Sequence, residues 1–169
     1  MPTNQYGIPT TLADDAGHHV LVLWLDRLSL SGDSEIWNWL REDYTEFTVR
    51  NTKIVIVTRQ NTAANLQFSN RFELFFDVLS DPEDQLIAEL KPKLPGTTLP
   101  EFCLIDPTGR VVKWSLGRSL KTELENLLSY LDSRRLIDDV VPEAKLFELV
   151  EKEPEIISIK ALCAGLSLI

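Results

Sequence analysis

Continuous apolar runs alternate along this chain with segments whose apolar residues recur at helical spacing. Residues 18–26 and 53–58 are almost entirely apolar, which is typical of strands buried on both faces of a sheet. The segment after the first run carries apolar residues on one helical face: Ile36, Leu40, Tyr44 and Phe47. Residues 61–72 predict a second helix after the second run. The pattern predicts two successive strand–helix units whose helices pack on a sheet.

Turn and capping residues organise the second half of the chain. Asp81 followed by Pro82 predicts a helix start, because aspartate caps the first amides and proline fits the first helical position. Residues 101–106 and 110–116 predict an antiparallel hairpin, since a Pro-Thr-Gly turn separates them. A leucine-rich helix is expected over residues 120–132. This order of elements predicts an α/β sandwich with a mixed sheet.

Composition divides the chain into three segments. Residues 1–17 are rich in polar and turn-forming residues and predict an irregular N-terminal arm. Residues 18–133 hold the α/β pattern, and residues 134–169 form a C-terminal extension with an apolar, helix-compatible end. That end either folds back on its own domain or docks on another subunit or protein, because exposed apolar patches usually mark interfaces.

Charge and cysteine content exclude several classes of function. The chain has 17 basic and 26 acidic residues, a net charge of -9, so we expect neither nucleic acid nor an anionic membrane as a partner. The start shows no secretory signal, and no apolar run reaches the roughly 18 residues of a membrane span, so we expect a cytoplasmic protein without a transmembrane segment. Cys103 and Cys163 are too few for a disulfide framework or a thiolate metal site. We expect no metal and no cofactor.

Two stretches, FFDVLSDPEDQLIAEL and LPEFCLIDPTGRVV, resemble in this order segments of the thioredoxin-like superfamily. The resembling branch contains the peroxiredoxins of the AhpC/TSA family and the thiol-disulfide reductases. The resemblance implies a thioredoxin-like α/β/α sandwich with a central mixed sheet, plus a C-terminal helical extension. In that family the proline before the hairpin strand is commonly cis and faces the redox cysteines, which implies a cis bond between Leu99 and Pro100.

The family's catalytic positions have lost their thiols in this sequence. The reductase motif Trp-Cys-x-x-Cys falls on WLDRLSLSGDSE, residues 24–35, so its two cysteines correspond to Ser29 and Gly32. In the peroxiredoxin register Ser29 replaces threonine, Gly32 replaces the peroxidatic cysteine, and Glu35 is retained. Thiol chemistry in this family requires a thiolate at a helix N-terminus. We therefore expect no catalytic residue at this turn, and the sequence favours a protein that is not an enzyme.

Two hypotheses about function remain. The first is a catalytically inactive thioredoxin/peroxiredoxin-like protein that binds other proteins, as a subunit or adaptor of a larger assembly or as a homo-oligomer. The resemblance places its binding groove between the degenerate active-site loop and the proline, at Ser29, Leu30, Ser31, Gly32, Thr98, Leu99 and Pro100. The alternative is an atypical thiol-dependent peroxidase or redox sensor that uses Cys163.

The other conspicuous side chains have simpler interpretations. Cys103 is expected to be a small buried hydrophobe in a central strand. Trp37 and Trp39 stand two positions apart on a helix and cannot both face the core. An exposed one could anchor a partner, whereas ordinary packing against the arm or the C-terminal segment is the interpretation that the sequence favours. The candidate interface residues are Trp37, Trp39, Ile156, Ile159, Leu162 and Leu166.

Overall fold

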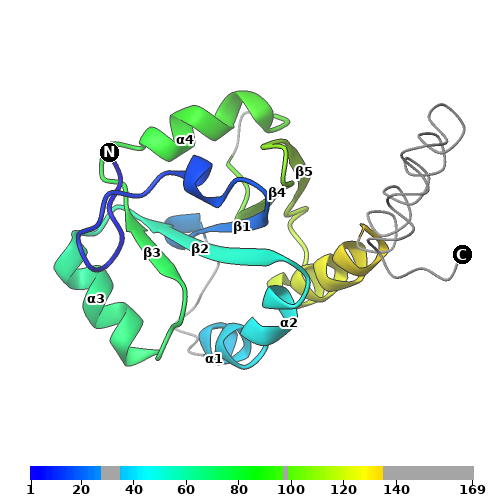
Figure 1. Cartoon of the computed structure of the whole chain (residues 1–169), viewed down its shortest axis with the longest axis horizontal. Helices are drawn as coiled ribbons and strands as arrows, with labels where there is room; N and C mark the ends of the chain where they lie inside the picture. Colours follow the sequence, from blue (N-terminus) through cyan, green and yellow to red (C-terminus); the bar gives the residue numbers. More distant parts are fainter. Residues whose placement is uncertain (28–34, 97–98, 135–169) are drawn as a thin grey trace, which may run out of the picture. The chain divides into compact units, whose positions relative to one another are not determined.

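A five-stranded mixed sheet forms the centre of the fold (Figure 1). The structure is a computed structural model that describes residues 1–27, 35–96 and 99–134. The chain divides into two compact units, residues 1–128 and 129–169. The sheet belongs to the first unit, and of the second unit the structure describes residues 129–134, which are helical.

The strands follow the order β3-β2-β1-β4-β5 across the sheet. Strand β1 (His19–Trp24) pairs in parallel with β2 (Thr52–Thr58), which pairs in parallel with β3 (Asp77–Ser80). On its other side β1 pairs antiparallel with β4 (Phe102–Ile105), which forms the hairpin with β5 (Val111–Trp114). The apolar runs therefore become β1 and β2, two of the three parallel strands, and the predicted hairpin and mixed sheet are confirmed.

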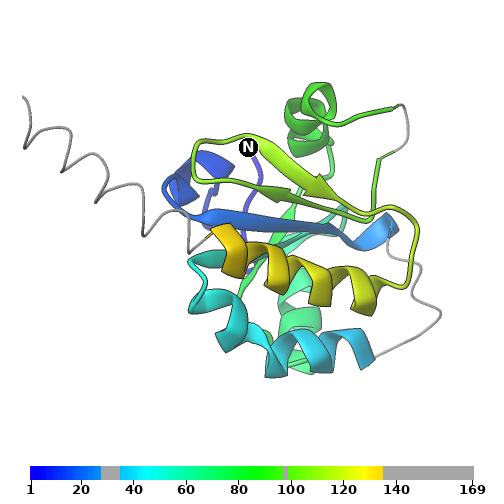
Figure 2. The same cartoon turned by 90° about the vertical axis from the view of Figure 1, so that its right-hand side faces the viewer.

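Helices cover both faces of this sheet. One face carries α1 (Glu35–Glu42), α2 (Tyr44–Thr48), α3 (Thr62–Arg71) and the helical residues 120–128, whereas α4 (Gln85–Leu90) lies on the other face (Figure 2). Short 3-10 turns complete the fold: η1 (Leu12–Asp15), η2 (Leu25–Arg27) and η3 (Lys91–Lys93). None of the described helices is long and apolar enough to cross a membrane.

The sequence predicted one continuous helix where the structure has α1 and α2. The break lies at Asp43, whose backbone (φ -91°, ψ 5°) leaves the helical region. Its carbonyl accepts the amides of Glu46 and Phe47 at 2.9 and 3.3 Å, so a new turn starts there. Ile36, Leu40 and Phe47 are nevertheless all buried, because both short helices present their apolar positions to the sheet.

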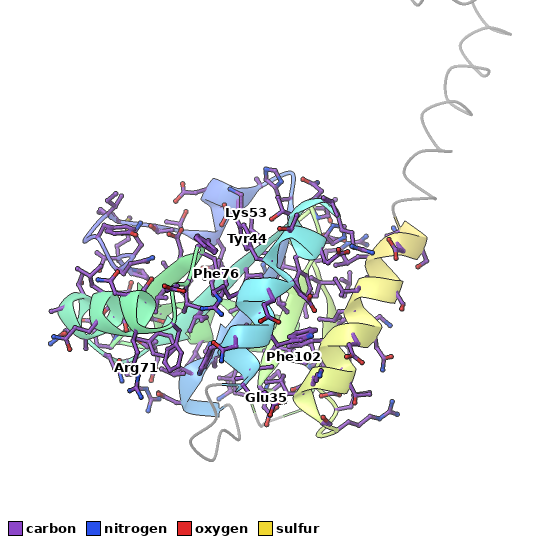
Figure 3. All side chains as sticks on the ribbon, turned by 90° about the horizontal axis from the view of Figure 1, so that it is seen from below. Glu35, Tyr44, Lys53, Arg71, Phe76 and Phe102 are labelled. Carbon is purple, nitrogen blue, oxygen red and sulfur yellow. The ribbon has the colours of Figure 1, made fainter. Side chains whose placement is uncertain are left out.

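The core has two layers, one on each face of the sheet. Because side chains alternate along a strand, Val20, Val22 and Trp24 of β1 join the layer under α4, together with Leu86 and Leu90. The intervening side chains point to the other face, where Phe102 lies between α1 and the helix that begins at residue 120 (Figure 3). All six residues of β1 are buried, which explains its uninterrupted apolar run.

Helix α4 begins later than the sequence predicted. Asp81 does cap it: its carboxylate oxygens accept the backbone amides of Gln85 and Leu86 at 2.9 and 2.8 Å. The expected start at Pro82 is wrong, because Asp84 adopts a left-handed backbone conformation (φ 54°) and separates the Pro82 turn from the helix. The carboxylate that accepts the first amides of α4 was predicted correctly, but the N-cap position is Asp84, and the intervening turn was not predicted.

The N-terminal arm is fastened to the edge of the sheet. Thr3 and Ser80 exchange two backbone hydrogen bonds of 3.3 and 2.8 Å, which adds a bridge beside β3. The buried side-chain amide of Gln5 donates to the Phe76 carbonyl at 3.2 Å and accepts the Val78 amide at 2.9 Å. The segment is irregular apart from η1, as predicted, and it forms part of the first unit.

Candidate functional site

The predicted site residues fall mostly outside the described part of the chain. Leu99 and Pro100 of the proposed groove are described, and both are partly buried. Outside the described residues lie the remaining groove positions Ser29, Leu30, Ser31, Gly32 and Thr98, and the C-terminal positions Ile156, Ile159, Leu162, Cys163 and Leu166.

A pocket of about 270 Å³ opens at the carboxyl ends of the three parallel strands. Open α/β sheets bind their ligands at this edge. Its apolar wall consists of Trp24, Val57, Ile87, Leu94 and Leu99, and its charged rim includes Asp26, Arg59, Asp84 and Lys91. Leu99 is the groove residue that the structure places in this pocket.

Arg59 organises the rim of the pocket. Its Nε and Nη2 donate to the two carboxylate oxygens of Asp84 at 2.9 and 2.8 Å, and its Nε lies 3.8 Å from Asp26 Oδ2. The hydrogen bond to Asp84, followed by the charge of that carboxylate, raises the pKa of the Arg59 guanidinium. The paired geometry fixes the guanidinium, since a two-point contact with a carboxylate restricts its orientation.

Trp24 is one of the residues that line the pocket. It ends β1 and is 2% exposed, with its ring in the layer under α4. Its indole Nε1 is buried and has no hydrogen-bond partner among the described residues. Buried polar groups are paired in the large majority of cases, so this donor stands out.

The charged rim and Trp24 are not among the residues that the sequence pattern indicated as a site. A signal was available, because Asp26 and Arg59 each follow a buried strand almost directly. That these side chains meet depends on β1 and β2 being parallel neighbours, which the sequence pattern alone did not establish.

Cys103 is the described cysteine, and it lies in the core of the sheet. It is 0% exposed, at the centre of β4 opposite Val22 of β1 and Trp114 of β5. Burial raises the pKa of the Cys103 thiol to about 12. The prediction that Cys103 is a buried hydrophobe is confirmed. Among the described residues no three His, Cys, Asp or Glu side chains form a group that could hold a metal ion.

The predicted cis bond before Pro100 is wrong, because no peptide bond among the described residues is cis. Trans is the lower-energy isomer of an X–Pro bond. The chain after the proline is also held in place: the Glu101 carbonyl accepts the Trp24 amide at 3.1 Å, and the Glu101 amide donates to Ser115 Oγ at 2.7 Å. These contacts align the segment with β1 and β5 in the trans form.

Both tryptophans of α1 pack against neighbouring helices, so the structure agrees with the ordinary packing that the sequence favoured over an exposed anchor. Trp37 is 3% exposed and packs edge-to-face on Phe68 of α3, with ring centroids 5.1 Å apart. Trp39 is half-buried and packs against Phe47 of α2 at 6.4 Å. The two rings do point in different directions, but helices on either side cover them. Trp37 is therefore a core residue and not an interface residue.

A second pocket of about 270 Å³ lies at the opposite end of the parallel strands. Tyr44 stacks on Phe76 there with ring centroids 6.1 Å apart, and Lys53 pairs with Asp15 at 2.6 Å (Figure 3). Burial, followed by the charge of Asp15, raises the pKa of Asp77 in its wall. Its position at the amino ends of the strands separates it from the predicted groove.

The sequence model of the AhpC/TSA family matches residues 1–114 of this chain. The chain belongs to the AhpC/TSA family. No curated protein sequence matches it. Among solved structures it is similar to the bacterioferritin comigratory protein of Xanthomonas campestris, at 21% identity and a TM-score of 0.65, covering 79% of this chain and 91% of that one.

Two further solved structures extend this likeness across the branch. The peroxidoxin BcpB of Mycobacterium tuberculosis is 18% identical with a TM-score of 0.63, covering 78% of this chain and 90% of that one. The thioredoxin domain of a Bacteroides vulgatus thiol-disulfide oxidoreductase is 20% identical with a TM-score of 0.54, covering 75% and 90%. The thioredoxin-like fold predicted from the sequence is confirmed.

Proposed function

We propose that this member of the AhpC/TSA family performs no thiol chemistry at the family's redox turn and acts by binding another protein. The observation that carries the proposal is the state of its cysteines. Serine and glycine stand at positions 29 and 32, and Cys103 is fully buried with a pKa of about 12.

The chemistry of a thiol peroxidase explains why these cysteines matter. A thiolate attacks the terminal oxygen of a peroxide, the O–O bond breaks, and the products are a sulfenic acid and an alcohol or water. The attacking group must be ionised and accessible to the peroxide. Cys103 meets neither condition, because burial keeps it protonated and the strands of the sheet surround it.

The binding surface of this proposal is the groove of Ser29, Leu30, Ser31, Gly32, Thr98, Leu99 and Pro100. The pocket beside Leu99 supports it, because a partly apolar hollow lies next to the groove at the ligand-binding edge of the sheet. The partner is a different protein or a second copy of this chain.

A second candidate function is a thiol-dependent peroxidase or redox sensor that uses Cys163. Family membership favours it, and the name given to the Xanthomonas campestris structure refers to alkyl peroxide reduction. In this candidate the sulfur of Cys163 would take the place of the missing thiolate.

A peroxide-consumption assay separates the two candidates. Wild type, Cys163→Ser and Cys103→Ala are supplied with hydrogen peroxide or an alkyl hydroperoxide and with excess dithiothreitol as reductant. The proposal predicts that peroxide disappears no faster with any of the three proteins than in buffer with dithiothreitol alone. Catalytic turnover in the wild type that disappears in Cys163→Ser would establish the second candidate and refute the first.

A further inference from the structure

The pocket at the amino ends of the parallel strands carries an excess of negative charge. Two carboxylates and one ammonium group line it, those of Asp15, Asp77 and Lys53, and His18 counts as neutral. Lys53 Nζ lies 2.6 Å from Asp15 Oδ1, so these two charges offset each other. Among the described residues the Asp77 carboxylate forms no ion pair and accepts a single hydrogen bond, from Asn4 Nδ2 at 3.5 Å. Asp77 is therefore the charged group of this pocket that lacks a counterion.

The surroundings of Asp77 make its negative charge unfavourable. Asp77 begins β3 and is half-buried, and burial, followed by the charge of Asp15, raises the pKa of its carboxyl group. Lys53 acts in the opposite direction but does not cancel these two effects. A cation that binds beside Asp77 offsets the cost, since a nearby opposite charge favours the ionised carboxylate.

Three aromatic side chains form another part of the lining. Tyr44 of α2 stacks on Phe76, with ring centroids 6.1 Å apart, and its ring lies 5.9 Å from that of Phe75. Figure 3 shows Tyr44 and Phe76 next to Lys53. Phe75 is 68% exposed, so its ring is accessible to a ligand. The faces of aromatic rings attract cations within about 6 Å of the ring centre, so these rings favour the same sign of charge as Asp77 does.

The charge and the rings together select the ligand. An anion is repelled by the excess negative charge, and a neutral apolar ligand would cover the Asp77 carboxylate without pairing it. Among cations, a guanidinium group is planar, stacks on aromatic rings, and is less strongly hydrated than an ammonium group. It also donates two hydrogen bonds to one carboxylate. The pocket of about 270 Å³ has room for this group, since a cavity of about 150 Å³ already holds benzene.

We infer that this pocket binds a guanidinium cation, which pairs with Asp77 and packs on the aromatic rings of Tyr44 and Phe75. The source of the cation is either an arginine side chain of another protein or a free guanidinium compound, and both present the same group. The inference does not rest on the proposed function, because the pocket lies at the opposite end of the strands from Leu99 and involves no thiol.

The probe is arginine blocked at both ends, N-acetyl-arginine methylamide, which carries a single positive charge. It is titrated at neutral pH into ¹⁵N-labelled full-length protein, and the backbone amide signals are followed by NMR. We expect the amide signals of Phe75 and Asp77 to shift with an affinity on the order of 1 mM for a ligand of this size. The amide signal of Leu99, at the opposite end of the strands, is the internal control and stays in place.

Two matched ligands test the charge and the planar group. N-acetyl-citrulline methylamide has the shape of the arginine probe but a neutral urea group, so it should bind at least about tenfold more weakly. N-acetyl-lysine methylamide keeps the charge without the planar group and should bind about threefold more weakly. A citrulline probe that binds as tightly as the arginine probe, or a lysine probe that binds more tightly, would overturn the inference.

Variants of the protein test the two contacts. Asp77→Asn keeps the shape of the side chain but removes its charge and should weaken binding of the arginine probe about tenfold, whereas Glu83→Gln, an exposed position outside the pocket, should not. Phe75→Ala removes an exposed ring and should weaken binding about threefold, whereas Leu116→Ala, also at an exposed position, should leave it unchanged. Unchanged affinity in both Asp77→Asn and Phe75→Ala, with thermal melts showing that they fold, refutes the site.

Free L-arginine separates the two sources of the cation. A site for a free compound also recognises the charged amino and carboxylate groups of L-arginine, which should then bind at least about tenfold more tightly than the blocked probe. Equal or weaker binding assigns the pocket to an arginine side chain within a polypeptide. Both results retain the guanidinium site, whereas the absence of shifts at Phe75 and Asp77 with either compound refutes it. Consumption of peroxide through Cys163 bears on the proposed function alone and leaves this site untouched.

Discussion

The thiol of Cys103 should be almost unreactive in the folded protein. Its pKa rises from an ordinary value of 9.0 to about 12 because burial penalises the thiolate. At about pH 8 this difference lowers the thiolate fraction roughly a thousandfold relative to an exposed cysteine. Since the thiolate is the nucleophile, the rate of modification should fall by at least about the same factor.

The assay uses Cys163→Ser, in which Cys103 is the remaining cysteine. Labelling by Ellman's reagent is followed at about pH 8 in the native protein and in urea. We expect native labelling at least about a thousandfold slower than in the unfolded chain. A native rate within about tenfold of the unfolded rate would show that the thiol is accessible, and the burial argument would fail.

The same burial predicts a pH dependence of stability. The folded state retains the Cys103 proton that the unfolded state releases above its pKa of 9.0, so the free energy of unfolding falls as the pH rises from 9.0 toward about 12. Between about pH 8 and 10 the wild type should lose about 1.4 kcal/mol more than Cys103→Ala in urea denaturation. Parallel losses in the two proteins would contradict the raised pKa.

Three further substitutions test the described contacts and the predicted register. Asp81→Ala removes two hydrogen bonds at the start of α4 and should lower the free energy of unfolding by about 1–2 kcal/mol in urea denaturation. Its control, Glu83→Ala at an exposed position, should change the same quantity by less than about 0.5 kcal/mol. Trp37→Ala should lower the free energy of unfolding by about 3–5 kcal/mol, and Trp39→Ala, at a half-buried position, should lower it clearly less. Equal losses in the two variants would argue against the packing of Trp37 on α3. Gly32→Cys should form a sulfenic acid with peroxide, detected by dimedone labelling and mass spectrometry. An inert cysteine at position 32 would contradict the alignment of this position with the family's peroxidatic cysteine.

The sequence predicted the elements whose signal is local and strong. The runs of β1 and β2 are uninterrupted because both faces of these strands are buried, so burial alone identified them. The hairpin was predicted from its turn, where Gly109 takes a positive φ of 86°. Asp81 was recognised as a cap because an aspartate before proline fits a helix start.

The sequence-based predictions fail where contacts between distant parts of the chain determine the local structure. The left-handed Asp84 and the break at Asp43 have no periodic signal, so the ends of α4 and α1 were misplaced. The sequence did not identify what packs on Trp37, because Phe68 of α3 and Phe72 just after that helix come from another part of the chain. The pocket was missed for a similar reason, because its walls come from strands and a helix that meet only in the folded sheet.

The contact between Thr3 and Ser80 has a consequence for self-association. An outermost strand offers its free backbone groups to any other extended chain, which is a common route to aggregation. Here the arm occupies that side of β3, and the side-chain amide of Gln5 binds the Val78 amide of β3 and the carbonyl of Phe76 just before it. A chain shortened by its first eight residues would therefore present a bare strand and should form oligomers or fibrils at concentrations where the intact chain remains dispersed.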